Sequence, residues 1–314
     1  VVTGTTPKTN IPEYWGKGHY WVTPAELNDT TVYIDKTERQ ITDEALSKTK
    51  LRLLPVGTVL LSSRAPIGKV AIANAEMYCN QGFKNCICSE AIYNKYLFYF
   101  LRLKKDYLNS LGRGATFKEI SKSIVESIKI PLPPKSTQLA IVSELDKINE
   151  LIRLKKEQLK DFDNLAQSLF YEMFGDPVEN EKGWEVKKLG EICEIFAGGD
   201  KPKDMCEIQN NEYIYPVIAN GEGEKGILGY TKNCRVTKEA VTIGARGASI
   251  GNCRIVKNGF TPAIRLLTLI PTGSIDCCFL YYFVKDLNYK QNGAGQAQLT
   301  VPNIKCEFIP LPPL

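Results

Sequence analysis

One sequence pattern is written twice along this 314-residue chain, and such an internal repeat constrains the fold more than any single motif. Three stretches of the first half recur, in the same order, about 180 residues later. They are a Gly-to-Lys turn, an Arg-to-Ile-Gly turn and a segment that ends in Ile-Pro-Leu-Pro-Pro: 4–8 with 198–203, 59–70 with 241–253, and 112–134 with 293–313. The sequence therefore predicts a duplicated domain.

Each copy consists mostly of short β-prone runs. Those bounded by Pro, Gly and Asn predict strands over 56–62, 70–73, 240–243 and 253–256. Between the second and third repeated stretches lie aromatic runs, which are too dense for exposed strands and indicate a buried helix or strand: 96–100 and 279–283. We therefore predict an α+β protein with two similar β-rich domains, over 1–134 and 176–314, joined by a long coiled-coil helix.

Residues 135–175 separate the two copies and carry a helical pattern. The prolines of 131–134 end the first domain, Ser136 is the predicted N-cap, and Gly175 followed by Pro177 ends the helix. With Lys155 counted, the apolar intervals alternate four and three, which is a heptad seam. The seam residues are Ile141, Leu145, Ile148, Ile152, Leu159, Phe162, Ala166, Leu169 and Met173. A rod of roughly 57 Å cannot bury this seam on one small domain, so the pattern predicts coiled-coil pairing.

The helix leaves some alternatives open. Lys155 is either a solvated break in the seam, which we favour, or a polar position that sets the register. Leu151, Leu154, Leu165 and Phe170 lie beside the seam and form either a second packing surface or contacts with the flanking domains. The second copy ends in Ile-Pro-Leu-Pro-Pro, the same motif that precedes the helix in the first copy. We therefore expect a second helix after it, or another chain that supplies one.

Composition limits the function further. The net charge is +5, and because 135–174 holds six Lys or Arg against seven Asp or Glu, the excess basic charge lies in the flanking domains. That distribution is compatible with nucleic acid. The ten Cys form no C-x-x-C pair and His19 is the one histidine, so we expect no zinc site and reduced, mostly buried thiols. No apolar run approaches the roughly 18 residues of a membrane span, and we expect a cytoplasmic chain.

Motifs for catalysis are also missing from the sequence. It has no Asn/Asp-Pro-Pro-aromatic loop to hold a flipped adenine, no P-loop, and no obvious triad partners for His19. We therefore expect neither enzymatic activity nor a cofactor. Two alternatives remain: a coiled-coil interaction protein that does not read DNA, and an enzyme with an unrecognised site.

The ordered set of motifs resembles the specificity subunit of type I restriction–modification enzymes. The motifs are Gly-Thr-Thr-Pro-Lys at 4–8, Pro-Glu-Tyr-Trp-Gly at 12–16, Tyr-Trp-Val-Thr-Pro at 20–24, the Arg turn at 64–68, Gln138 after Ile-Pro-Leu-Pro-Pro, and Trp-Glu-Val-Lys-Lys-Leu-Gly at 184–190. The resemblance covers essentially the whole chain. Two departures are that the closing helix and the start of the first domain are not seen.

The resemblance implies a non-catalytic subunit that binds double-stranded DNA. Two target-recognition domains each read one half of a split, asymmetric sequence. The helical region spaces them and docks two modification (methyltransferase) subunits, and restriction subunits, the translocase and nuclease, then join.

Gly-rich polar loops bring cations close to a DNA backbone, so we take their residues as candidate contacts. These are Thr5, Thr6, Lys8, Thr9, Ser63, Arg64, Lys69, Arg113, Thr116, Lys118, Lys201, Lys203, Asn220, Arg246, Asn252, Gln296 and Gln298. Because Arg64 and Arg246 recur in both copies, they cannot explain two different targets, so they suit phosphate or structural roles. We expect the base-reading residues where the copies differ, such as 113–118 against 296–300.

Overall fold

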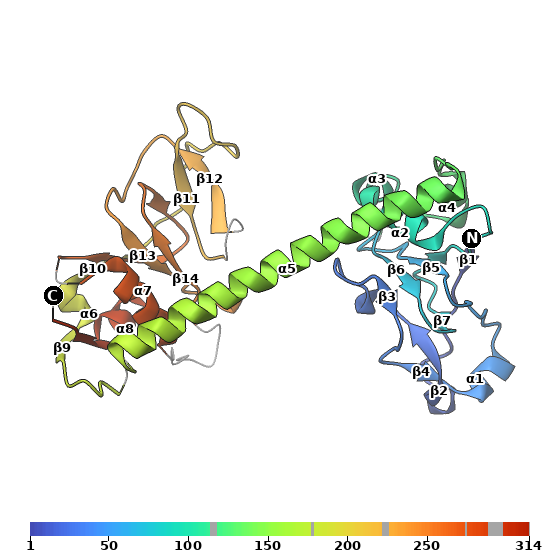
Figure 1. Cartoon of the computed structure of the whole chain (residues 1–314), viewed down its shortest axis with the longest axis horizontal. Coiled ribbons are helices and arrows are strands. Elements are labelled where there is room, and N and C mark those ends of the chain that lie inside the picture. Colours follow the sequence, from blue (N-terminus) through green and yellow to red (C-terminus); the bar gives the residue numbers. More distant parts are fainter. Residues whose placement is uncertain (114–117, 177–178, 222–225, 274, 288–297, 314) are drawn as a thin grey trace. The chain divides into compact units, whose positions relative to one another are not determined.

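A computed structural model describes residues 1–113, 118–176, 179–221, 226–273, 275–287 and 298–313 (Figure 1). The chain divides into two compact units, Val1–Lys155 (unit 1) and Lys156–Leu314 (unit 2). Each unit has its own sheets and its own core. Thr116 and Gln296 lie outside the described residues.

Unit 1 is built from short strands with helices on one sheet. Its first sheet contains β1 (Val2–Thr3), β8 (Lys84–Asn85), β5 (Val59–Leu61), β6 (Val70–Ala73) and β3 (Tyr33–Ile34), with isolated bridges joining β5 to the β8 segment. The second contains β4 (Gln40–Ile41), β2 (Trp15–Val22) and β7 (Tyr78–Cys79). The helices are η1 (Pro12–Tyr14), η2 (Pro24–Glu26), α1 (Asp43–Lys48), α2 (Asn94–Leu103), α3 (Lys105–Ser110) and α4 (Lys122–Ser127).

Unit 2 repeats this plan with longer strands. A four-stranded antiparallel sheet has the order β10 (Cys193–Ala197), β16 (Leu267–Pro271), β13 (Ala240–Ile243) and β14 (Cys253–Val256). A second sheet has the order β12 (Ile227–Thr231), β11 (Tyr215–Ile218) and β15 (Thr261–Pro262), and β17 (Phe308–Leu311) pairs with β9 (Glu185–Lys188). The helices are α6 (Leu189–Ile192), η4 (Gly247–Ser249), α7 (Cys277–Asp286) and α8 (Val301–Lys305).

The pairing pattern confirms the duplication. In unit 1 the order β1, β8, β5, β6 corresponds to β10, β16, β13, β14 in unit 2. In the second sheets, β2 runs parallel to β7 and antiparallel to β4, just as β11 runs parallel to β15 and antiparallel to β12. The strands predicted at 70–73, 240–243 and 253–256 are confirmed as β6, β13 and β14. The strand predicted at 56–62 is β5, which spans only 59–61.

Both aromatic runs lie in helices rather than strands. Helix α2 buries Leu97, Phe98 and Leu101, and this spacing of three and four residues places one apolar face against β5 and β6. Helix α7 does the same in unit 2 with Phe279, Phe283 and their neighbours. Burying a Phe side chain fully contributes about 1.5–3 kcal/mol, so these faces fix each helix on its sheet.

The long helix α5 runs from Lys135 to Phe174. The predicted N-cap at Ser136 is wrong, because the helix already includes Lys135, and the backbone N–H of Gln138 donates to the Pro134 carbonyl at 3.1 Å. The predicted end is confirmed, since Gly175 adopts the left-handed conformation, with a φ of 74°, that stops a helix.

The first turns of α5 belong to unit 1 and are fixed there by a buried amide. The Gln138 side chain donates to the carbonyls of Ala91 (3.0 Å) and Pro133 (2.9 Å), and it accepts the Tyr93 N–H at 2.8 Å. Further along, Asp146 accepts from the Lys95 ammonium at 2.7 Å. These bonds tie the start of the helix to the segment that leads into α2.

The last turns of α5 pack on unit 2 through aromatic rings. The ring of Phe170 lies 5.3 Å from that of Phe279 and 5.4 Å from that of Tyr282, and Phe174 lies 5.9 Å from Trp184. Of the alternatives for Phe170, contact with the flanking domain is therefore the one observed. By contrast, every seam residue except Leu145 and Ala166 is exposed on this chain, and Leu159 is 64% exposed.

The cysteines are all free, but they are not mostly buried as predicted. Three are buried, five are half-buried and two are exposed. Burial raises the pKa of Cys79 to about 12, which keeps this thiol protonated at neutral pH. Among the described residues no group of His, Cys, Asp and Glu could hold a metal ion, and no helix is long and apolar enough to cross a membrane.

Candidate nucleic-acid interface

The Gly-rich turns of the two copies pack in the same way. A Cβ added to Gly4 would lie 2.1 Å from the Asn80 carbonyl oxygen, and one added to Gly198 would lie 2.7 Å from the Ala263 nitrogen. Any side chain here would push the two backbone segments apart, so glycine is required at both positions. The turns are thereby held against the segment that connects β7 to β8 in unit 1 and β15 to β16 in unit 2.

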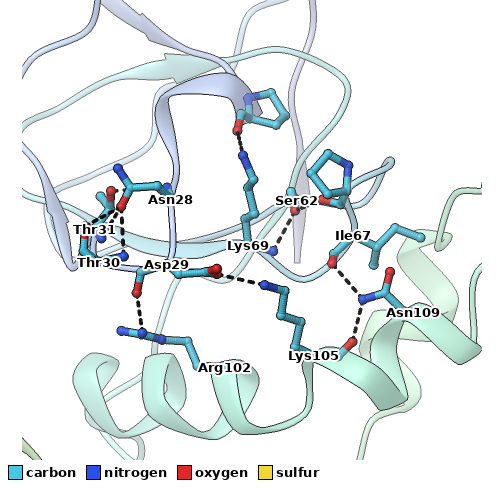
Figure 2. A network of polar contacts seen from close by, with 12 residues as sticks. Asn28, Asp29, Thr30, Thr31, Ser62, Ile67, Lys69, Arg102, Lys105 and Asn109 are labelled. Carbon is cyan, nitrogen blue, oxygen red and sulfur yellow. Dashed lines mark hydrogen bonds and ion pairs between the residues drawn. The ribbon is translucent and has the colours of Figure 1, made fainter. Parts of the chain in front are cut away.

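The Arg turn of unit 1 lies between β5 and β6 and is fixed by side-chain bonds, which Figure 2 shows. The Ser62 hydroxyl donates to the Pro66 carbonyl (2.8 Å) and accepts the Lys69 amide (2.9 Å). From α3, the Asn109 amide donates to the Ile67 carbonyl at 3.0 Å. The turn is thus rigid before any ligand binds.

The same network includes Lys69, one of the predicted DNA contacts. The Lys69 ammonium points to the Pro24 carbonyl and donates to it at 3.2 Å (Figure 2). Lys69 therefore bridges the Arg turn to the segment after β2, and we assign it a structural role. Nearby, Asp29 is paired with Lys105 at 2.8 Å, and this bond, with its charge, lowers the pKa of the Asp29 carboxyl.

Arg64 projects from this turn and is paired with a carboxylate. Its Nε lies 3.0 Å from Glu119, and the same carboxylate lies 3.1 Å from the ammonium of buried Lys84. Burial alone would raise the pKa of Glu119, but the bonds from Lys84 and Arg64 outweigh it and lower the pKa. Ser63 is fully buried and its carbonyl accepts the Ile120 amide, so its predicted DNA contact is wrong.

In unit 2 the corresponding arginine bonds to a neutral side chain. Arg246 donates to the Gln298 side-chain oxygen at 3.4 Å, and the bridge between these residues matches that of Arg64 with Glu119. The strand register places Leu267 where unit 1 has Lys84. The two predicted arginines thus occupy one structural position, but among the residues that the structure describes only Arg64 of the two has a charged partner.

A groove in unit 2 brings several predicted residues together. It encloses about 590 Å³, and its polar and charged lining includes Asp200, Lys201, Arg246, Arg265, Gln298 and Thr300. Three cations against one carboxylate make this groove electropositive, as a surface for a phosphate backbone requires. Sequence reasoning missed Arg265 and its neighbour Ile264, because no motif or repeat marks them.

Asn220, another predicted DNA contact, holds two segments of this groove together. Its side-chain amide donates to the Ile264 carbonyl at 2.7 Å, and its carbonyl oxygen accepts the Ala245 amide at 2.7 Å. Both ends of the amide are therefore engaged by backbone.

The remaining predicted contacts lie on loops and are still candidates. Thr6 donates to Gln81 and is half-buried, and the others are exposed: Thr5, Lys8, Thr9, Arg113, Lys118, Lys201, Lys203 and Asn252. The histidine is not part of this surface. His19 Nε2 lies 2.8 Å from Asp43 Oδ1, which is a surface pair beside the Tyr78 ring.

Two solved structures share this fold. The chain superposes with a TM-score of 0.52 on the crystal structure of a type I restriction–modification S subunit from M. genitalium, over 98% of this chain and 87% of that one, at 18% identity. It superposes with a TM-score of 0.54, at 21% identity, on a chain from a structural study of assembly of the type I system, over 100% and 84% of the two chains. The fold is therefore that of type I S subunits.

Sequence comparison gives the family directly. The model of the type I restriction modification DNA specificity domain matches residues 1–161 and 181–314, so the chain belongs to this family. The MjaIX specificity subunit of Methanocaldococcus jannaschii is 32% identical over 351 residues, which span 100% of this chain and 81% of that protein. The EcoprrI specificity subunit of Escherichia coli is 26% identical over 96% of this chain and 78% of its own length. The family predicted from the ordered motifs is confirmed, and the chain is a specificity rather than a catalytic subunit.

Proposed function

We propose that this chain directs a type I restriction–modification complex to a split DNA sequence, with each unit reading one half. The observation that carries the proposal is a repeated construction. In both units a Gly turn packs against the connection between two strands, and an arginine bonds to a segment whose residues differ between the copies. Two copies of one binding surface with different neighbours suit two different half-sites. The shared Arg64 and Arg246 suit phosphates, which carry no sequence information.

We further propose that α5 pairs through its seam with a second helix, from this chain or another. This helical region spaces the two reading units and docks two modification subunits, which restriction subunits then join in the cytoplasm. The exposed apolar seam supports this proposal, because a row of side chains such as Leu159 and Phe162 in water is unfavourable unless a partner covers it.

The test is to express the chain with its modification subunit in a host without other methylation and to map methylated adenines across the genome. One split motif with adenine methylated on both strands is the expected result. The absence of any motif, with both subunits shown to be assembled, would contradict the proposal. A companion measurement is duplex affinity against salt, where log affinity falls linearly with log salt if cations contact phosphates.

A further inference from the structure

The connection from β15 to β16 in unit 2 contains an unusual turn, Ile264–Arg265, which we name the 264–265 turn. Both residues have left-handed backbone conformations, with φ values of 50° and 59°. Among the described non-glycine residues only Asn180 shares a positive φ. This conformation is strained for L-residues and most of all for a β-branched side chain such as Ile.

Hydrogen bonds to the Gly turn of unit 2 and to the side chain of Asn220 hold the strained turn. The Ile264 amide donates to Gly199 O at 2.8 Å, and the Arg265 amide donates to Gly198 O at 3.1 Å. On the other side, Asn220 binds the Ile264 carbonyl and, through its oxygen, the Ala245 amide next to Arg246. The surrounding structure therefore imposes the conformation.

Packing does not account for this strain. The Ile264 side chain is 44% exposed, and Arg265 is exposed beside it on the electropositive groove that contains Lys201 and Arg246. The Arg265 guanidinium has no hydrogen-bond or ion-pair partner among the described residues. A rigid turn that presents an apolar side chain and a free cation to solvent is typical of a site preorganised for a ligand.

The first copy has different chemistry at the same place. Val22 pairs with Cys79 as Ile218 pairs with Pro262, and the Asn80 amide donates to Val22 as the Ala263 amide does to Ile218. This register puts Gln81 and Gly82 of unit 1 at the positions of Ile264 and Arg265. Gln81 and Gly82 lack the left-handed conformation of Ile264 and Arg265, so the two copies differ at this turn in both backbone conformation and side chains.

We propose that the 264–265 turn reads bases in the half-site of unit 2, a role that rests on the proposed function. Arg265 donates to O6 and N7 of a guanine in the major groove, and Ile264 contacts the methyl group of a thymine. These are the base-edge groups that a guanidinium and an apolar side chain recognise. Lys201 and Arg246, on the same groove, bind phosphates and set the register.

The experiment measures target discrimination by the chain assembled with its modification subunit. The probes are duplexes that carry the mapped target or single-base changes in either half. Arg265→Gln is expected to lower discrimination at one G·C pair of the second half by about 5- to 150-fold, the range for losing one bidentate contact. Discrimination in the first half stays unchanged. The control Lys238→Gln removes an exposed cation of unit 2 outside the groove and leaves both halves unchanged.

A second variant separates reading from folding. Ile264→Gly relieves the left-handed strain, so the thermal midpoint of unfolding stays the same or rises, while discrimination at a neighbouring A·T pair falls. The control Ile208→Gly removes an Ile that is 77% exposed elsewhere in unit 2 and changes neither half. A lower midpoint with intact discrimination would show a structural role and overturn the proposal.

The outcomes distinguish the two proposals. A split target that the wild-type complex methylates, with Arg265→Gln and Ile264→Gly leaving second-half discrimination intact, overturns the reading role alone. A wild-type complex that selects no split target overturns the proposed function and the reading role together.

Discussion

Replacing Glu119 with Gln tests how the Arg turn of unit 1 is held. The carboxylate accepts from Arg64 at 3.0 Å and from Lys84 at 3.1 Å, and the Lys84 side chain is only 7% exposed. Glu119→Gln keeps the shape of the side chain but leaves the ammonium of Lys84 buried without a counter-charge. Unit 2 shows that a neutral arrangement fits the same frame, since Leu267 and Gln298 occupy these positions.

The magnitude follows from burial. Removing one partner of a fully buried ion pair costs about 3–5 kcal/mol, whereas an exposed pair is worth about 0.2–1 kcal/mol. Because the Glu119 side chain is 35% exposed and Lys84 is buried, we expect Glu119→Gln to destabilise unit 1 by about 2–3 kcal/mol. Adding Lys84→Leu removes the orphaned charge and brings the double variant to within about 1 kcal/mol of wild type.

The assay is urea unfolding followed by tryptophan fluorescence. Trp15 and Trp21 lie in unit 1, so a Trp184→Phe background makes the signal report on that unit. Glu44→Gln, at an exposed carboxylate, is the matched control and should change stability little. If the double variant were as unstable as Glu119→Gln, or if Glu119→Gln matched the control, the reasoning from the buried ammonium would be refuted.

Three further predictions concern unit 1, and one comparison variant, at Gly183, lies in unit 2. The folded-state pKa of Glu119 is lowered, so the stability that its carboxylate contributes is complete above the unfolded pKa of about 4.5 and is lost as pH falls through the folded pKa. The difference in stability between wild type and Glu119→Gln should therefore close over that range. Urea midpoints measured against pH would show this. Gly4→Ala places a Cβ 2.1 Å from Asn80 O and should cost about 2–3 kcal/mol, whereas Gly183→Ala, with φ of 65° and open space, should cost about 1 kcal/mol, both by thermal unfolding. Gln138→Ala orphans the Tyr93 amide and should cost about 2–3 kcal/mol, with faster hydrogen exchange at that amide; unchanged exchange would contradict the clamp.

The repeat predicted much of the fold because its signals are local. The strands at 70–73 and 253–256 are short β-prone runs between turn residues, and the structure has them at those bounds. The Gly4 and Gly198 turns were also visible, since only glycine tolerates so close a backbone approach. The end of α5 was predicted because glycine readily adopts the left-handed conformation that Gly175 has.

The sequence does not reveal contacts between distant residues. Ser63 and Lys69 sit in a basic, polar turn and looked accessible, but Ser63 is buried by the strands around it and Lys69 is bound by Pro24, 45 residues away. Asn220 was likewise predicted only as a DNA contact, because the sequence does not reveal its hydrogen bond to Ile264, 44 residues away. No local sequence pattern predicts hydrogen-bond partners that lie so far away in the chain.

The 264–265 turn was missed for a related reason. Left-handed backbone is anticipated at Gly, Asn or Asp, and neither Ile nor Arg favours it. Only the tertiary frame of Gly198, Gly199 and Asn220 produces it.

The central claim is that each unit reads its own half of the target. The direct measurement is the affinity of the chain, assembled with its modification subunit, for four duplexes: the target, each half scrambled, and both scrambled. The two variants are Arg113→Gln, in the segment of unit 1 where the copies differ, and Arg265→Gln in unit 2. We predict that loss of Arg113 reduces the penalty for scrambling one half only, and that loss of Arg265 reduces the penalty for scrambling the other half only. Equal effects of both variants on both halves would contradict it.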